Sequence, residues 1–291
     1  MRKMAKHLFI AAVIFLVVIF VVFFCFKNIN HSEPEIKSLP PIPEETIRIL
    51  EGWTSRDISQ YFEREGRYQS EEFLEVAGFP QVDYRDNKEM PAIPDFSLNF
   101  SFLEDKPKYY GLEGYLFPDT YRIYASSSVT DVIEKMLINF DNKLTPKMRE
   151  DIKAQGRTIY ETIILASIIE KEAPLNYRTG DNSDAKIVAG IFLNRLSVGQ
   201  ALQSDATLSY IYNDKKSAHS GVELDVDSLY NTYKYQGLPP GPICNPGILA
   251  IEAAIYPADT DYNYFLTTDN GDIFYAKTYN EHLKNKYKYL K

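Results

Sequence analysis

The chain has 291 residues, of which 45% are hydrophobic, and its net charge at neutral pH is −8. Such an acidic chain is a poor partner for nucleic acid, because the phosphates repel it. Its two cysteines and four histidines are scattered, which argues against a disulfide framework and a metal site. We therefore expect neither a metal nor another cofactor.

The N-terminal segment predicts a membrane anchor. An uncharged apolar run covers residues 8–26, about the length that crosses a bilayer as a helix. Basic residues occur in the tail at residues 1–7, which favours a cytoplasmic N-terminus and an extracytoplasmic body. A cleaved signal peptide is the alternative, but no small-residue cleavage site ends the run. We predict a retained, single-pass anchor in the cell membrane.

Residues 27–45 form a predicted stalk. The segment is polar and carries four prolines, which stiffen an otherwise flexible linker. Such a stalk would hold the following residues above the membrane surface.

Residues 46–110 predict a small strand-helix-helix module followed by a long connection. Residues 46–50 alternate like a short strand, and Thr54 with Asp57 matches the capping box that begins a helix. That helix ends near Gly66, and a second one begins near Ser70. Residues 79–110 are rich in proline and aromatic residues, with a possible strand at 96–102.

From residue 111 onward the sequence predicts helices and one hairpin. The dipeptide Asn270-Gly271 separates two alternating aromatic runs, 262–267 and 273–276, which is a strong hairpin signal. Helices and hairpins without a βαβ rhythm indicate an α+β fold. The predicted helices are 129–142, 146–154, 158–173, 182–199, 246–255 and 278–290.

The helix predicted at 158–173, TIYETIILASIIEKEA, is apolar almost all the way round and is therefore expected to be buried. It ends in Glu170-Lys171-Glu172. Burial and the helix dipole both disfavour a negative charge there, so a glutamate could stay protonated near neutral pH. General acid catalysis needs such a group. The helix alone does not choose between Glu170 and Glu172, and solvent-exposed glutamates are the alternative.

Four loop-like segments, at 113–121, 202–207, 230–233 and 237–247, combine tyrosines with amides, carboxylates and cyclic residues. Aromatic faces pack on sugar rings, while amides and carboxylates bind hydroxyl and acetamido groups. These segments therefore suit a sugar polymer. Structural turns are the other interpretation.

The same segments carry a family resemblance. EGYLFPDTY, ASIIEKEA, IFLNRL, LQSDAT, YNTY and GLPPGPICNPG occur in this order behind an N-terminal anchor. Together they resemble the YceG-like (MltG) family of endolytic murein transglycosylases, and residues 49–66 resemble the LysM-like part of that family. The resemblance implies a LysM-like module and connection at 46–110 and an α+β catalytic domain at 111–291.

The resemblance implies a lyase that acts on nascent peptidoglycan strands and terminates their elongation. Glu172 is the residue that matches the family's catalytic glutamate. It would protonate the glycosidic oxygen between N-acetylmuramic acid and N-acetylglucosamine. As a carboxylate it would then take the proton of the C6 hydroxyl, which closes a 1,6-anhydro ring. One carboxyl serves both steps, whereas glycoside hydrolases usually need two.

By the same resemblance, Gln203 and Asp205 are expected to border the cleft and to orient the substrate or the catalytic side chain. Asn231 and Tyr233 are expected to do the same from the next segment. The implied partners are peptidoglycan glycan strands, the membrane through residues 8–26 and, as a further candidate, peptidoglycan synthases.

Two other functions stay open at this point. In a muramidase-type hydrolase, Glu172 would be the acid and Asp205 would activate water. In a non-enzymatic scaffold, the chain would bind glycan and recruit synthases. Arg195 could pair with a carboxylate such as Glu170 or have a structural role.

Overall fold

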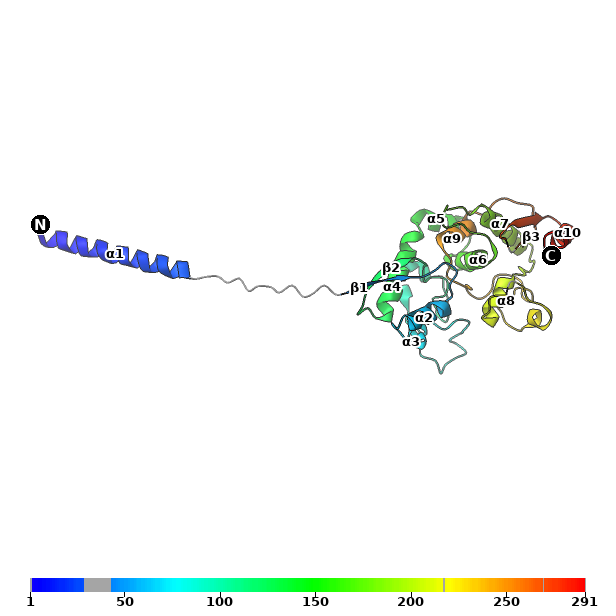
Figure 1. Ribbon diagram of the computed structural model, residues 1–291, viewed down its shortest axis with the longest axis horizontal. Helices are drawn as coiled ribbons and strands as arrows, with labels where there is room; N and C mark the ends of the chain where they lie inside the picture. Colours follow the sequence, from blue (N-terminus) through cyan, green and yellow to red (C-terminus); the bar gives the residue numbers. More distant parts are fainter. Residues whose placement is uncertain (1, 29–42, 217, 269, 291) are drawn as a thin grey trace. The chain divides into compact units, whose positions relative to one another are not determined.

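The computed structural model describes residues 2–28, 43–216, 218–268 and 270–290. The chain divides into two units, Met1–Ile42 and Pro43–Lys291, which we describe separately. The first contains helix α1 (Arg2–Asn28) (Figure 1). Within the described ranges, its segment Met4–Lys27 alone is long and apolar enough to cross a membrane. Most of the predicted stalk, residues 29–42, lies outside the described residues.

The second unit begins with a strand and two helices, as predicted. Strand β1 (Glu44–Arg48) precedes helices α2 (Ser55–Arg64) and α3 (Ser70–Ala77). The capping box forms: the Asp57 backbone N–H donates to Thr54 Oγ1 at 3.0 Å, and the Thr54 N–H donates to Asp57 Oδ2 at 2.9 Å.

The partner of β1 comes from much later in the chain. Strand β2 (Thr120–Tyr124) pairs antiparallel with β1, and Ile47 faces Tyr121 across the pair. Both side chains are buried. The chain order around this sheet is therefore strand, helix, helix, strand, and the second strand lies beyond residue 110. The first two residues of β2 belong to the segment 113–121, for which a loop was predicted.

The connection at 79–110 contains two 3₁₀ helices, η1 (Phe96–Leu98) and η2 (Ser101–Leu103), where a strand was expected. The strand prediction is wrong. The Asp95 side chain accepts the Ser97 N–H at 3.0 Å and starts a turn in place of an extended segment. The turns bring Phe96 and Phe102 into the core.

The predicted helices and hairpin after residue 124 are confirmed. Two helices, α8 and η3, are not among the predicted ones, and the first three residues of α8 belong to the segment 202–207 that the composition assigns to a loop. Strands β3 (Tyr264–Thr267) and β4 (Ile273–Ala276) form the hairpin. The helices are α4 (Val129–Lys143), α5 (Pro146–Ala154), α6 (Ile159–Glu172), α7 (Ser183–Ser197), α8 (Asp205–Tyr212), α9 (Ile248–Ile255), α10 (Tyr279–Tyr289) and the 3₁₀ helix η3 (Gly221–Asp225).

Helix α6 lies in the centre of this unit, as its apolar surface predicted. It packs against α7, α8 and α9 (Figure 1). Every residue from Thr162 to Ile169 is buried. Burying one large aliphatic side chain contributes roughly 1.5–3 kcal/mol, so this helix is strongly anchored. Its C-terminal residue, Glu172, is therefore presented from a rigid support.

Candidate active site

A cavity of about 500 Å³ opens at the C-terminal end of α6. This volume lies in the range of ligand sites, roughly 300–1,000 Å³. Three helices form most of its wall: the start of α2 with Arg56, the end of α6 with Lys171 and Glu172, and α8 from Asp205 to the residues after its end.

Glu172 is half-buried and faces this cavity. Its Oε1 accepts a hydrogen bond from the Ser204 hydroxyl and another, at 3.3 Å, from the Ala206 backbone N–H. Within the described part of the chain, Oε2 accepts no hydrogen bond. Because two donors fix Oε1 as an acceptor, the protonated acid carries its hydrogen on Oε2.

The surroundings of Glu172 favour the protonated form. Burial raises the pKa of this carboxyl, and the negative charge of Asp205 raises it further. The hydrogen bonds from Ser204 and Ala206 and the charge of Arg195 act in the opposite direction, but the net shift of the pKa is upward. This is the property expected of a general acid.

Glu170 lies at the same helix end but not on the cavity wall. Its Oε2 accepts the Tyr177 hydroxyl at 2.5 Å and the Gly247 N–H at 3.0 Å. Burial raises its pKa to about 7. A side chain at Gly247 would place its Cβ 2.5 Å from the Tyr177 hydroxyl, so this packing requires glycine. Between the two glutamates, only Glu172 is open to a ligand.

Asp205 and Tyr233 both lie near Glu172. Asp205 is the first residue of α8 and lines the cavity. Tyr233 lies beside both carboxylates: after burial, their negative charges are the main causes that raise its pKa. Asp205 therefore lines the cavity beside Glu172, whereas Tyr233 lies next to both carboxylates but is not part of the cavity lining.

Gln203 has a backbone role that the sequence did not reveal. Its φ of 53° lies in the left-handed region, which is uncommon for a residue other than glycine. Its N–H donates to Thr232 O at 3.0 Å, and the next N–H, of Ser204, donates to Thr232 Oγ1 at 3.0 Å. This turn directs Ser204 toward Glu172. The Gln203 side chain is exposed.

Asn231 does not face the cavity. It is fully buried, and its amide nitrogen donates to Leu224 O and Val226 O, both at 2.9 Å. Its Oδ1 accepts the Tyr233 N–H at 3.0 Å. Because its amide is engaged with the backbone, the geometry gives no support to the predicted direct contact with substrate. Asn231 instead shapes the loop that holds Tyr233.

Arg195 does not pair with Glu170. It is buried and donates to the backbone carbonyls of Leu202 and Asn263, the latter at 2.7 Å from Nη2. It therefore ties the turn before Ser204 to the β3 hairpin, a structural role.

His219 is a residue of this site that we overlooked in the sequence. Its ring is fully buried between two carboxylates: Nδ1 lies 3.6 Å from Asp205 Oδ1, and Nε2 lies 3.4 Å from Asp214 Oδ1. Its backbone N–H also donates to Asp205 Oδ1 at 3.2 Å, and its ring stacks on Tyr212. His219 thus packs behind two carboxylates that line the cavity.

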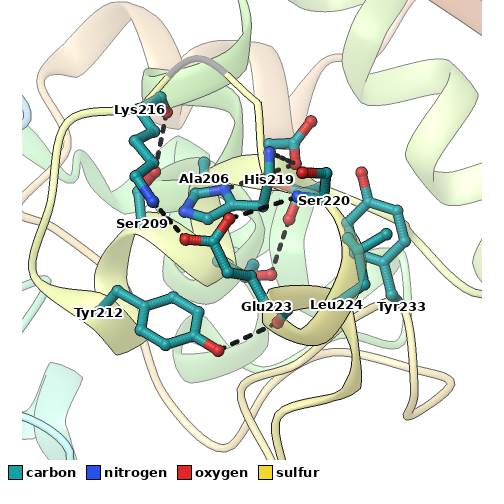
Figure 2. Close-up of polar contacts among 12 residues, drawn as sticks. Ala206, Ser209, Tyr212, Lys216, His219, Ser220, Glu223, Leu224 and Tyr233 are labelled. Carbon is teal, nitrogen blue, oxygen red and sulfur yellow. Dashed lines mark hydrogen bonds and ion pairs between the residues drawn. The ribbon is translucent and has the colours of Figure 1, made fainter.

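Figure 2 shows how the loop that carries His219 folds back on α8. The Ser209 hydroxyl donates to Lys216 O at 3.0 Å, and the Tyr212 hydroxyl donates to Glu223 O at 3.2 Å (Figure 2). Lys216 also forms an ion pair with Glu223. The sequence offers no signal for these contacts, because they join side chains that have no characteristic spacing along the chain.

Glu113 fixes the side of the cavity formed by α2. It is buried, and its Oε1 accepts the Ser55 N–H at 2.9 Å and the Asn245 amide at 3.0 Å. The Tyr210 hydroxyl donates to Oε2 at 3.4 Å. Burial raises the pKa of Glu113 to about 7. It does not line the cavity, so its role is to join the start of α2 to the rest of the wall.

Comparisons with known proteins agree with this architecture. An endolytic murein transglycosylase of Bacillus subtilis is 36% identical over 204 residues, which cover 70% of this chain and 54% of that protein. One of Streptococcus pneumoniae strain D39 is 34% identical over 250 residues, 82% of this chain and 44% of that protein. The chain spans about half the length of the curated relatives it matches.

A solved structure is similar as well. The crystal structure of a putative yceG-like protein from Listeria monocytogenes superposes with a TM-score of 0.67 at 33% identity, covering 85% of this chain and 77% of that one. The model of the YceG-like family matches residues 29–288. The chain therefore belongs to the YceG-like family.

Proposed function

We propose that the chain is a membrane-anchored lytic transglycosylase that cuts peptidoglycan strands internally. The observation that carries this proposal is the arrangement of Glu172: a carboxyl with a raised pKa that lines a cavity, with its Oε1 held by two donors and its Oε2 accepting no hydrogen bond among the described residues. The names of the curated relatives support the same reaction.

In the first step, the Glu172 acid donates the proton of Oε2 to the glycosidic oxygen between N-acetylmuramic acid and N-acetylglucosamine. The bond from C1 of the muramic acid to this oxygen breaks, and N-acetylglucosamine leaves with a free 4-hydroxyl. Ser204 and Ala206 stabilise the carboxylate that forms, because both donate to Oε1.

In the second step, the Glu172 carboxylate takes the proton of the C6 hydroxyl as this oxygen bonds to C1. The product is a 1,6-anhydro ring, the acid is regenerated and no water is consumed. A single carboxyl suffices because the nucleophile belongs to the sugar.

The residues around Glu172 have supporting roles in this proposal. Asp205 and Tyr233 bind the hydroxyl and acetamido groups of the strand near the cut. The exposed Gln203 side chain contacts the strand at the rim. His219 acts as a positioning residue that holds Asp205 through the loop.

The proposed placement in the cell follows from the N-terminal helix. The single anchor has its N-terminus in the cytoplasm, and residues 43–291 lie on the extracytoplasmic side of the membrane, where glycan strands are assembled. The LysM-like module comprises β1, α2, α3 and β2, which have the strand-helix-helix-strand order described above. Nearness to the membrane would favour nascent strands and contact with peptidoglycan synthases.

The ends of the products test the reaction. Purified glycan strands would be digested with the wild-type protein and their ends identified by mass spectrometry. We expect 1,6-anhydro-muramic acid ends. The second candidate is a muramidase, which Asp205 supports because it lines the same cavity as Glu172. Reducing muramic acid ends alone would favour that hydrolase.

A non-enzymatic scaffold makes a different prediction. A scaffold that only binds glycan would keep its cellular function when Glu172 is replaced by glutamine. Loss of both strand cleavage and complementation by a folded Glu172→Gln protein would exclude it.

A further inference from the structure

Basic side chains line the cavity beside Glu172 from three parts of the chain. Arg56 of α2, Lys171 of α6 and Lys215 after α8 all line it. Among the described residues, none of these three forms an ion pair. Lys216, on the same wall, does pair with Glu223. Unpaired cations are notable here because the chain as a whole is acidic, with a net charge of −8.

Carboxylates line the same cavity, and three of them have partners within the chain: Asp57, Asp205 and Asp214. Asp57 Oδ2 accepts both the N–H of Thr54, at 2.9 Å, and its hydroxyl, at 2.7 Å. Asp205 lines the cavity, and His219 lies behind it: the His219 N–H donates to Asp205 Oδ1 at 3.2 Å. Arg56 and Lys171 line the cavity without an ion pair among the described residues, although the charge of Lys171 acts on Glu170 of the same helix.

Two of these cations, Arg56 and Lys171, come from different elements, α2 and α6. Arg56 lies in the first turn of α2 and is half-buried, which restricts its guanidinium. Lys171 reaches toward the turn that precedes α2: a Cβ at Gly52 would lie 3.4 Å from its Nζ. Gly52 has a φ of 74°, a conformation that glycine tolerates and that other residues rarely adopt.

We propose that Arg56 and Lys171 form a subsite for carboxylate groups carried by the substrate strand. The proposal rests on the proposed function and names the feature of the strand that is recognised. A guanidinium binds a carboxylate through two parallel hydrogen bonds, and a neighbouring ammonium adds a point charge. The sugar hydroxyls and acetamido groups of a glycan strand are neutral, so its carboxylates are the groups that such a pair selects.

Two positions on peptidoglycan carry carboxylates. One is the lactyl group of a muramic acid without a peptide, and the other is the stem peptide. Both have the same chemistry, and the strand can be modified to separate them. In either case α2 contributes a substrate-binding residue, Arg56, in addition to any role that this helix has in the LysM-like module.

The test compares three forms of the same purified strands. The first carries intact stem peptides, the second has all carboxylates converted to primary amides, and the third has its peptides removed by an amidase. Wild type, Arg56→Gln/Lys171→Gln and the control Lys153→Gln, an exposed lysine of α5 outside the cavity, are assayed on each.

We expect the double variant to lose about 100-fold in kcat/KM on carboxylate-bearing strands, mainly through KM, since each lost charged hydrogen bond costs about tenfold. Amidation should lower wild-type cleavage by a similar factor, and the double variant should no longer distinguish the two strands. If the double variant still cleaves peptide-free strands more slowly than wild type, the subsite binds the lactyl carboxylate. If the difference disappears on these strands, the subsite binds the stem peptide. A preference for carboxylates that the double variant retains in full would overturn the proposal.

Binding separates this proposal from the proposed function. The affinity for intact and amidated strands would be measured in the Glu172→Gln background, with and without the two glutamines. A carboxylate preference that depends on Arg56 and Lys171 supports the subsite even if no strand is cleaved. Equal affinity for both strands would reject the subsite while leaving the cleavage reaction intact.

Discussion

Glu170 and Glu172 are two residues apart on one helix, but only Glu172 lines the cavity in which a ligand could accept its proton. At about 100° per residue they point to nearly opposite sides of α6. Burial raises the pKa of both carboxyls. Glu170 is enclosed by Tyr177 and Gly247, whereas Glu172 faces the cavity with one oxygen unbonded among the described residues. Burial makes a carboxyl a weak acid, but access to a ligand is what lets it donate the proton.

The largest expected effect separates these two residues directly. Glu172→Gln should lower kcat/KM on glycan strands by about 1,000-fold, the scale of a lost general acid. Glu170→Gln should stay within about tenfold of wild type, because a Gln oxygen can still accept from Tyr177 and Gly247. Steady-state rates on purified strands give both values. Equal losses would refute the distinction.

A smaller effect concerns the support of Asp205 by His219. Both His219→Ala and Asp205→Asn should lower kcat/KM by about tenfold, and the double variant should lose little more than either single variant, because contacting residues couple. His219→Gln should retain part of the activity. If the two losses multiply, His219 does not act through Asp205.

The pH profile of kcat/KM should move in opposite directions in two variants. Ser204→Ala removes a donor that lowers the pKa of Glu172, so the loss of activity at alkaline pH should begin at a higher pH. Asp205→Asn removes a negative charge that raises this pKa, so the loss should begin at a lower pH. Shifts of the same sign in both variants would exclude Glu172 as the titrating acid.

The buried carboxyls outside the cavity should affect stability instead of catalysis. Glu113 and Glu170 have a pKa of about 7 in the folded protein, above the ordinary value of 4.5. The folded state then binds more protons than the unfolded state between these values, so stability falls as the pH rises from 4.5 to 7.

Glu113→Gln should reduce this pH dependence, since its oxygen still accepts from Ser55 and Asn245 while the titration is removed. Urea unfolding of residues 43–291 at pH 5 and pH 8 measures it. An unchanged difference in unfolding free energy between the two pH values would show that Glu113 does not titrate in this range.

The parts of the fold with local causes were predictable from the sequence. The burial of α6 followed from its uniformly apolar surface, and the β3–β4 hairpin followed from Asn270-Gly271. The pairing of β1 with β2 was not predictable in this way. Its strands are separated by two helices and a long connection, and residues 120–121 belong to a segment whose composition is typical of a loop.

The site shows the same limit. The resemblance selected Glu172, Asp205 and Tyr233, which the structure brings together around one cavity or beside it. It could not show that Asn231 is turned inward, because an amide that binds backbone and one that binds substrate look alike in a sequence. His219 was missed for a related reason: Asp205 and Asp214 lie on either side of its ring only in the folded chain.

The central claim is that Glu172 cuts the strand without a second catalytic carboxyl and without water. Cleavage of purified strands in water enriched in ¹⁸O tests it most directly, with mass spectrometry of the new muramic acid ends. We expect these ends to contain no ¹⁸O, because the C6 hydroxyl of the same sugar forms the new bond. One ¹⁸O atom at each new end would contradict this and would identify a hydrolase.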